Sequence, residues 1–214
     1  MAACLLAGAP AFSAEKSPSL PSAYTSVRRA AIPEEDEESR YAFVPQASWY
    51  VCRSKQGEIG RNSVPPERLR KHRQGDCANF TGASLDDADL KGAALDGADL
   101  NHARLMRVQL KGARLKWADV NYADLQRADL EAVVAPGARF VGTMLDQANL
   151  KQADLTDATL VSASLERANL KEAVLVDADF RGARLLGATL SKADLRGAAF
   201  PGADLTGAGL AGAD

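Results

Sequence analysis

The chain has 214 residues, a length that suits one sizeable domain or two small ones. Hydrophobic residues make up 46% and charged residues 25%, a balance that supports a packed core and excludes a wholly disordered chain. The formal net charge of -2 argues against a binder of bulk polyanions, and the lack of an apolar run of about 18 residues excludes a membrane-spanning helix.

The N-terminal segment is a short apolar run, Ala2 to Ala14, that is rich in small residues. It resembles the hydrophobic region and cleavage zone of an export signal, with cleavage expected after Ala11 or Ala14. The basic residues that normally precede such a region are missing, so the second half of a longer bipartite signal and a plain apolar terminus stay as alternatives. We expect residues 1–14 to be a targeting segment outside the fold.

Residues 15–40 are expected to form a flexible linker. They are rich in Ser, Pro and Ala, and residues 34–38 are a continuous acidic run. Such a composition buries too little apolar area to offset the entropy of ordering the chain. An acidic docking tail is the alternative interpretation of the run.

Residues 41–77 are expected to form a small cap on the part that follows. The aromatic-rich stretch from Tyr41 to Cys52 predicts a short strand. Pro65-Pro66 predicts the first turn of a helix that runs to Gln74 and stops at Gly75. Four basic side chains on this helix form either a solvated face or a weak anion site: Arg68, Arg70, Lys71 and Arg73.

From Ala78 to the C-terminus a five-residue pattern repeats without a slip in register. Each unit has one large apolar residue, the centre, and centres fall at every multiple of five from Phe80 to Leu210, which gives 27 positions. Of these, 21 are Leu and four are Phe; the exceptions are Val120 and Ala135. Ala stands two residues before the centre in 25 of 28 units. Such regularity predicts a repeat architecture.

A period of five fits neither a helix nor a flat strand, because both would turn successive centres away from a common core. The pattern is satisfied if the chain turns a corner in each unit, so that four units close a coil of about 20 residues. Gly follows the centre by two residues in 12 of 27 units, where a tight turn requires a positive φ. We expect the centres from Phe80 to Leu210 to be nearly fully buried and their neighbours exposed.

A coil of 20 residues sorts the centres onto four faces, and all four Phe centres fall on one face. They are Phe80, Phe140, Phe180 and Phe200. The small centre Ala135 precedes Phe140 in the same coil, so the ring is expected to fill the space that a Leu would use.

The units resemble the motif of the pentapeptide-repeat family, Ala-(Asp/Asn)-Leu-x-x, as in Ala88-Asp89-Leu90 and Ala153-Asp154-Leu155. The resemblance covers about two thirds of the chain. It implies an all-β fold over residues 78–214, a right-handed quadrilateral β-helix of about seven coils with type II or type IV turns at its corners. It implies little about function, because the family includes lumenal and cytoplasmic proteins, DNA-mimicking gyrase protectors and membrane-associated members.

The sequence offers no catalytic chemistry beyond its repeat. His72 and His102 have no Cys, Asp or Glu at a metal-ligand spacing, and phosphate-loop, nucleophile-elbow and zinc-protease motifs are missing. Asp residues are frequent directly before centres, such as Asp89 and Asp129, where short polar side chains bond turn backbone. We therefore expect a protein that is not an enzyme and that has no cofactor or metal.

Cys52 and Cys77 are the two cysteines that follow the expected targeting segment. In an oxidising compartment, a disulfide between them would staple the cap over the first coil and would contribute roughly 3 kcal/mol for a loop of about 25 residues. Two free, half-buried thiols are the alternative, and the sequence leaves both open.

The expected function is a non-catalytic protein-interaction or assembly scaffold, similar to exported pentapeptide-repeat proteins of the thylakoid lumen. A DNA-mimicking topoisomerase (gyrase) modulator is the alternative, but residues 78–214 carry 19 acidic and 15 basic residues, which is only a mild acidic excess. A periplasmic structural spacer is a third interpretation, which the sequence does not separate from the lumenal one. No nucleic-acid partner is expected.

Two surfaces are candidates for a protein partner. The C-terminal coil has no counterpart of the cap, so its open edge and Leu210 predict self-association or capping by a partner. Apolar residues that flank the centres predict a ridge along one corner, with scattered valines of no further role as the alternative. The ridge comprises Val134, Pro136, Val141, Val161, Val174 and Val176, with Met144 and Leu186 on the following face.

Overall fold

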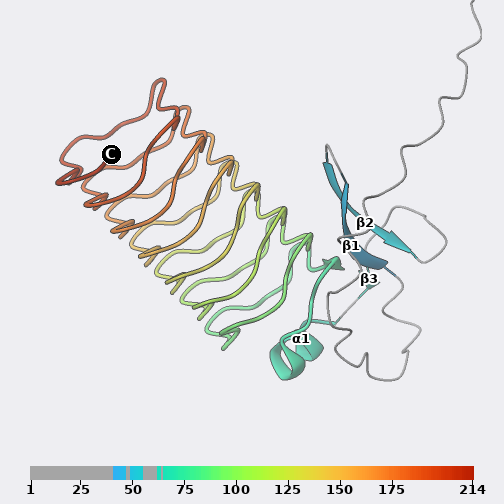
Figure 1. Cartoon of the computed structure of the whole chain (residues 1–214). Helices are drawn as coiled ribbons and strands as arrows, with labels where there is room; N and C mark the ends of the chain where they lie inside the picture. The colour runs from blue at the N-terminus through green and yellow to red at the C-terminus, as the bar shows by residue number, and fades with distance from the viewer. Residues whose placement is uncertain (1–40, 47–48, 55–61, 64) are drawn as a thin grey trace, which may run out of the picture. The chain divides into compact units, whose positions relative to one another are not determined.

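The computed structural model describes residues 41–46, 49–54, 62–63 and 65–214 (Figure 1). The expected targeting segment and linker lie outside the described residues. Within the described ranges, no helix is long and apolar enough to cross a membrane.

The N-terminal part contains a hairpin where the sequence predicted one short strand. Strand β1 (Tyr41–Gln46) pairs antiparallel with β2 (Trp49–Ser54), and Phe43 lies opposite Cys52. Strand β3 (Asn62–Ser63) pairs in parallel with β4 (Ala78–Asn79). Cys52 and Cys77 form a disulfide, with their Cα atoms 5.6 Å apart.

Helix α1 (Pro66–His72) is shorter than predicted and closes the first coil of the solenoid (Figure 1). It ends at Arg73, which adopts a left-handed conformation and donates its backbone N–H to the Leu69 carbonyl at 2.8 Å. Leu69 is fully buried in the solenoid core. The predicted stop, Gly75, has a different role: an added Cβ would lie 2.8 Å from Leu95 Cδ2, so this position has no room for a side chain.

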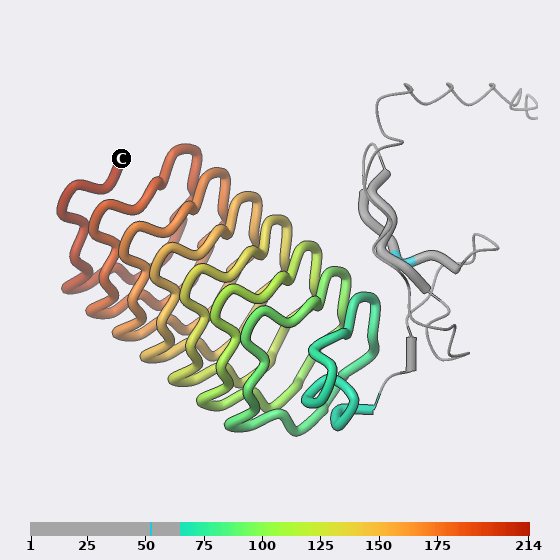
Figure 2. The backbone as a smooth tube through the Cα atoms, turned by 60° about the horizontal axis from the view of Figure 1, so that its bottom comes forward, coloured from blue at the N-terminus to red at the C-terminus, as the bar shows by residue number. Residues whose placement is uncertain are grey.

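From Gln74 onward the chain winds into stacked four-sided coils (Figure 2). Isolated bridges pair each outward residue with the residue twenty positions later, from Gln74↔Ala94 to Thr189↔Gly209, and all are parallel. The predicted twenty-residue register is therefore confirmed, and it never shifts along the stack. Backbone N–H groups donate between coils throughout, as in the 2.7 Å bond from Leu85 to the Arg104 carbonyl.

Each coil presents four faces, which we number by their first centre. Face 1 begins at Phe80, face 2 at Leu85, face 3 at Leu90 and face 4 at Leu95, and each continues in steps of twenty residues. The corner residues two positions after each centre join one face to the next.

All 28 corner residues from Cys77 to Gly212 have a positive φ. Twelve of them are Gly, which confirms the predicted reason for Gly at this position, and the other sixteen carry side chains. None is Val, Ile or Thr, because a branched Cβ clashes in the left-handed region. A backbone bond such as Ala83 N–H to the Phe80 carbonyl, 2.9 Å, closes each corner, and the positive φ at its third residue is the feature of a type II turn.

The centres form one continuous core, and most of the burial prediction is right. From Phe80 to Leu190 every centre is buried. The prediction is wrong for the last four centres, which are half-buried or exposed because only the preceding coil packs against them. These four are Leu195, Phe200, Leu205 and Leu210. Residues beside the centres are more covered than predicted, because neighbouring coils stack their side chains in columns.

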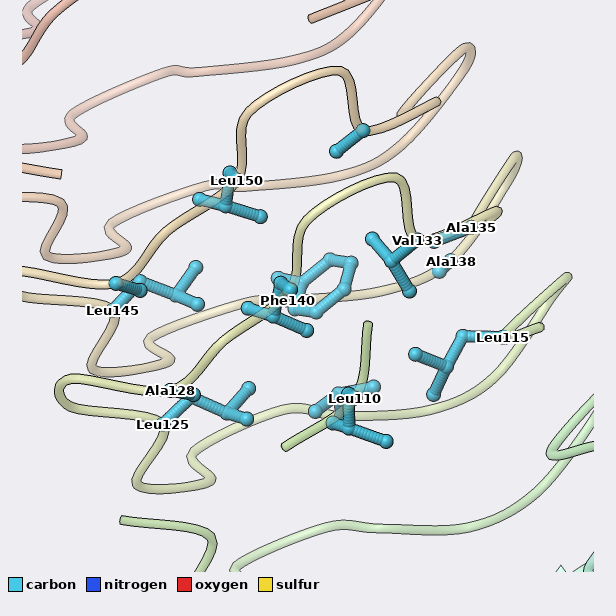
Figure 3. Close-up of a cluster of buried hydrophobic side chains, with 14 of the residues drawn as sticks. Leu110, Leu115, Leu125, Ala128, Val133, Ala135, Ala138, Phe140, Leu145 and Leu150 are labelled. Atoms are coloured by element: carbon cyan, nitrogen blue, oxygen red, sulfur yellow. The ribbon is translucent and has the colours of Figure 1, made fainter. Parts of the chain in front are cut away.

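The small centre Ala135 is compensated inside its own coil (Figure 3). Val133 replaces the usual Ala two residues before it, and the Phe140 ring lies on the next face; all three are fully buried. Along face 1 the rings of Phe180 and Phe200 stack with centroids 4.8 Å apart. Larger side chains at neighbouring positions thus compensate for the small Ala135, and the core stays closely packed.

Candidate interaction surface

The frequent Asp and Asn residues before the centres hold the turns. In eleven units their Oδ1 atom accepts the backbone N–H of the residue after the centre, as in Asp89 to Lys91 at 3.3 Å and Asp204 to Thr206 at 2.9 Å. This N–H is a turn donor that the ladder between coils does not use. These carboxylates are therefore structural acceptors, as the sequence predicted.

A second way of binding this donor was not predicted. In five units that lack Asp or Asn before the centre, the acceptor is an Asp or Asn one coil earlier, as in Asp76 Oδ1 to the Asp96 N–H at 2.8 Å. The sequence signal for this hydrogen bond is an Asp or Asn twenty residues before the donor residue. In the units of Pro136 and Pro201, the residue before the centre is Val134 or Ala199, whose side chain cannot accept a hydrogen bond. No acceptor is needed there, because proline has no backbone N–H. The presence of Pro136 is therefore explained by the turn itself, without a partner.

The cationic face predicted for α1 is partly occupied by contacts to the first coil. Arg70 donates from Nη2 to the Ser84 carbonyl at 2.8 Å, and Arg73 pairs with Asp89 at 2.8 Å. Both groups support the attachment of the helix to the solenoid.

The six predicted ridge residues fall on two faces that meet at one corner. Val134, Pro136, Val174 and Val176 lie on face 4, with Asp154 bridged between Val134 and Val174. Val141 and Val161 lie on face 1, exactly one coil apart. Only Val174 exposes more than a third of its surface, at 37%, and the other five are half-buried.

Two aromatic residues at the corners of one coil strengthen this surface, although the sequence analysis left them out of it. Trp117 is 38% exposed and Tyr122 is 56% exposed. The Trp117 ring lies over Gly137, where a Cβ would come within 2.5 Å of it, and Tyr122 lies over Gly142 in the same way. Tyr122 also stacks on His102, with ring centroids 5.2 Å apart.

The signal for this arrangement was a Gly exactly one coil after each aromatic residue. Together with the ridge residues, these aromatic side chains form one surface over faces 4 and 1 of the solenoid, which we call the apolar patch. It comprises Trp117, Tyr122, Val134, Pro136, Val141, Val161, Val174 and Val176.

The ionisable groups indicate ion-paired surfaces. The Arg181 guanidinium hydrogen-bonds the Asp179 carboxylate and lowers the pKa of that carboxyl. Arg196 lowers the pKa of Asp194 in the same way. Among the described residues, no group of three His, Cys, Asp or Glu side chains is placed to hold a metal.

Comparison with protein families finds the pentapeptide repeats, in eight copies. The matched residues are 76–112, 113–152, 123–160, 148–185, 163–207 and 183–214. The comparison with curated proteins gives no match.

Several solved structures are similar. A trypsin-treated form of QnrB1, a plasmid-mediated fluoroquinolone resistance protein, is 21% identical over 66% of this chain and 81% of its own, with a TM-score of 0.56. HetL, a pentapeptide-repeat protein involved in heterocyst differentiation regulation in the cyanobacterium Nostoc sp. strain PCC 7120, is 34% identical over 66% and 76%, with a TM-score of 0.27. A pentapeptide-repeat protein from the Arabidopsis thaliana thylakoid lumen is 29% identical over 47% and 59%, with a TM-score of 0.26. The likeness to QnrB1 concerns the fold alone.

Proposed function

The chain belongs to the pentapeptide-repeat family, whose members fold as right-handed quadrilateral β-helices, and from that premise we propose that it is a non-catalytic scaffold that binds a protein partner through the apolar patch. The observation that carries the proposal is the exposure of Trp117 and Tyr122 at successive corners of one coil. Aromatic side chains held in place by their surroundings contribute strongly to protein interfaces, because little entropy is lost when they are covered. Val141 and Val161 extend the same surface.

The test is a triple variant, Val141→Lys, Val161→Lys and Val174→Lys. These side chains point outward, so the variant is expected to keep its circular dichroism and thermal midpoint while losing proteins that co-purify with the wild type. The matched control places three lysines on face 2, at Ser84, Gln126 and Thr206. Complexes that survive in the triple variant, or that are lost equally in the control, would remove the patch from consideration.

We further propose an exported compartment, with the thylakoid lumen first and the bacterial periplasm as the alternative. The Cys52–Cys77 disulfide supports this, because such bonds persist in oxidising compartments. The apolar run from Ala2 to Ala14 is a second support from the sequence. Fractionation combined with N-terminal sequencing tests the proposal, since a mature N-terminus near residue 14 in a lumen fraction is expected and an intact Met1 in cytosol would oppose it.

Self-association through the last coil is a separate proposal. Leu210 is 46% exposed, and the three centres before it are only half-buried. Light scattering over a range of concentrations is expected to show association that Leu210→Glu abolishes. A wild-type protein that stays monomeric at high concentration would argue against it.

The DNA-mimicking alternative is favoured by one observation. Counted with their two bounding corners, face 4 (with Asp214) and face 1 each carry a net charge of -3, so the acidic residues gather around one side of the solenoid. Inhibition of gyrase supercoiling by the purified chain would support this function over the scaffold. No inhibition at a large molar excess would exclude it.

A further inference from the structure

One face of the solenoid is positively charged although the solenoid as a whole is acidic. Counted with its two bounding corners, face 3 carries eight basic and five acidic residues, while faces 1, 2 and 4 are each net negative. The basic residues are Lys91, Arg107, Lys111, Arg127, Lys151, Arg167, Lys171 and Lys192. The acidic residues are Asp87, Asp89, Asp129, Glu131 and Glu172.

Some of these cations are neutralised on the face itself. Arg107 binds Asp87 at 2.6 Å, Lys111 binds Glu131 at 3.0 Å, and Lys171 lies 3.7 Å from Glu172. Surface pairs of this kind contribute little to stability. Because each cation already has a carboxylate partner, it is less available to an anionic ligand.

Three cations in the middle of face 3 are different. Within the part of the chain that the structure describes, Arg127, Lys151 and Arg167 form no ion pair within 4.0 Å, although Lys151 interacts electrostatically with the Glu131 carboxylate that Lys111 binds. Arg127 and Arg167 stand two coils apart in the same corner column and are exposed. Lys151 belongs to the coil between them and lies on the other side of face 3, next to the corner residue Gln152. We call these three residues the cationic triad.

The backbone behind the triad is held by a ladder of side-chain hydrogen bonds. Asn149 Nδ2 donates to Asp129 Oδ1 at 3.0 Å, and Asn169 Nδ2 donates to Asn149 Oδ1 at 3.1 Å. The Oδ1 atoms of Asp129, Asn149 and Asn169 also accept the turn N–H groups of the residues after their centres. The cations therefore stand on a rigid base, and little backbone entropy is lost when a ligand binds them.

We propose that face 3 binds an acidic segment of a protein partner through the cationic triad. Coils are about 4.8 Å apart, so Arg127 and Arg167 stand about 10 Å apart along the stack. An extended peptide rises about 3.3 Å per residue, so a run of four or five acidic residues spans the distance from Arg127 to Arg167. This proposal is independent of the apolar patch, which lies on faces 4 and 1.

Charge complementarity favours a protein segment over the other anionic partners. Nucleic acid presents an even row of phosphates, which would also approach the five carboxylates of face 3 and the chain's overall negative charge. The outward and corner residues of face 3 include no aromatic or large aliphatic side chain that would insert into a membrane. A peptide can place its carboxylates at the three cations and leave the acidic positions uncovered.

The experiment is a titration of the full chain against a fluorescein-labelled peptide of eight glutamates, followed by fluorescence anisotropy at about 50 mM salt. The test variant is Arg127→Gln with Arg167→Gln; glutamine is accepted at these corners, since Gln147 and Gln152 have φ of 59°. We expect affinity to fall about tenfold, the effect of two lost charge contacts. The matched control, Lys116→Gln with Arg139→Gln, removes the same charge from exposed positions on faces 4 and 1 and is expected to stay within about twofold.

Three results would overturn the proposal, provided that circular dichroism shows both variants folded. The wild type could fail to bind the peptide, or the control could lose as much affinity as the test variant, which would indicate a response to total charge. A third is tighter binding, through the same two arginines, of a 20-base-pair DNA duplex or of vesicles with 30% phosphatidylglycerol. That last outcome would give face 3 a different partner.

Discussion

The two ends of the solenoid differ in how their cores are covered. At the N-terminal end, α1 places Leu69 against the first coil, and both Leu69 and Phe80 are buried. At the C-terminal end, Leu205 is half-buried and Leu210 is 46% exposed. The five-residue repeat is the same at both ends, so the difference comes from what packs against it.

This comparison shows that full burial of a centre requires a packed layer on both sides of its coil. Stability in such a stack is close to a sum over units and their interfaces. The same substitution should therefore cost most in the middle, less at a capped end and least at the last coil.

The largest contrast is expected for a charge placed at a centre. Leu150→Asp should prevent folding of the stack, at a cost of at least about 4 kcal/mol, because Leu150 is only 1% exposed and the carboxylate would have no partner. Leu210→Asp should change stability by less than about 1 kcal/mol. Far-ultraviolet circular dichroism and urea unfolding of both variants check this, and a soluble Leu150→Asp protein with an unchanged spectrum would contradict the model.

The cap is tested by truncating a side chain at each end. Leu69→Ala should cost about 2–4 kcal/mol, since it leaves a cavity between α1 and the first coil. Leu205→Ala should cost about 1 kcal/mol, because its side chain is already partly in solvent. Hydrogen exchange measured by peptide mass spectrometry locates the loss; equal effects at both ends would mean that α1 does not cover the core.

Corner glycines offer a smaller test with the backbone held constant. Gly137 and Gly202 have φ of 66° and 68°, so alanine costs about 1 kcal/mol at either position. At Gly137 the new Cβ would also displace the Trp117 ring. At Gly202 no atom lies within 4 Å of the position that a Cβ would take. Gly137→Ala should therefore cost about 2 kcal/mol and shift Trp117 fluorescence to the red, measured with Trp49 replaced by Phe. A larger effect at Gly202 would contradict the structure.

The smallest effects are expected from pH, with opposite signs toward the two ends. Burial raises the pKa of Asp76, so its contribution is fully present below the unfolded-state pKa and is lost as pH rises through the folded-state value. The hydrogen bond from Arg196 lowers the pKa of Asp194, so that group stabilises above the unfolded-state pKa and loses its effect as pH falls through the folded-state value.

Asp76→Asn should therefore stabilise the protein at pH 7 by at most about 1 kcal/mol, because 34% of this side chain is exposed, and the gain should vanish in acid. Asp194→Asn should destabilise it slightly at pH 7, with the difference becoming smaller as pH falls. Urea titrations at pH 7 and pH 3 measure both, with the exposed corner residue Asp157 changed to Asn as a control. Two variants that shift in the same direction would show that burial at Asp76 is not the cause.

The partner surface was only partly predictable from sequence. The valines and Pro136 were found because apolar residues stand out among polar flanking positions. Trp117 and Tyr122 were left out, since their exposure depends on glycines one coil later that let the rings lie flat. The positive face 3 was also missed, because its cations are spread over more than 100 residues of sequence and gather only when the coil register is applied.

The sequence by itself determined the coil. A large apolar residue at every fifth position, Ala two before it and Gly at the corners allow only a chain that turns four times per twenty residues, because each of these is a local steric requirement. What only the tertiary structure decided is how much of each residue stays in solvent and which distant residues meet. The end of α1 at Arg73, the bond from Asp76 to the next coil and the half-burial of Phe200 all depend on neighbours twenty residues away or on their absence. The burial of a residue depends on the coils above and below it, whereas the five-residue repeat is the same at every position along the stack.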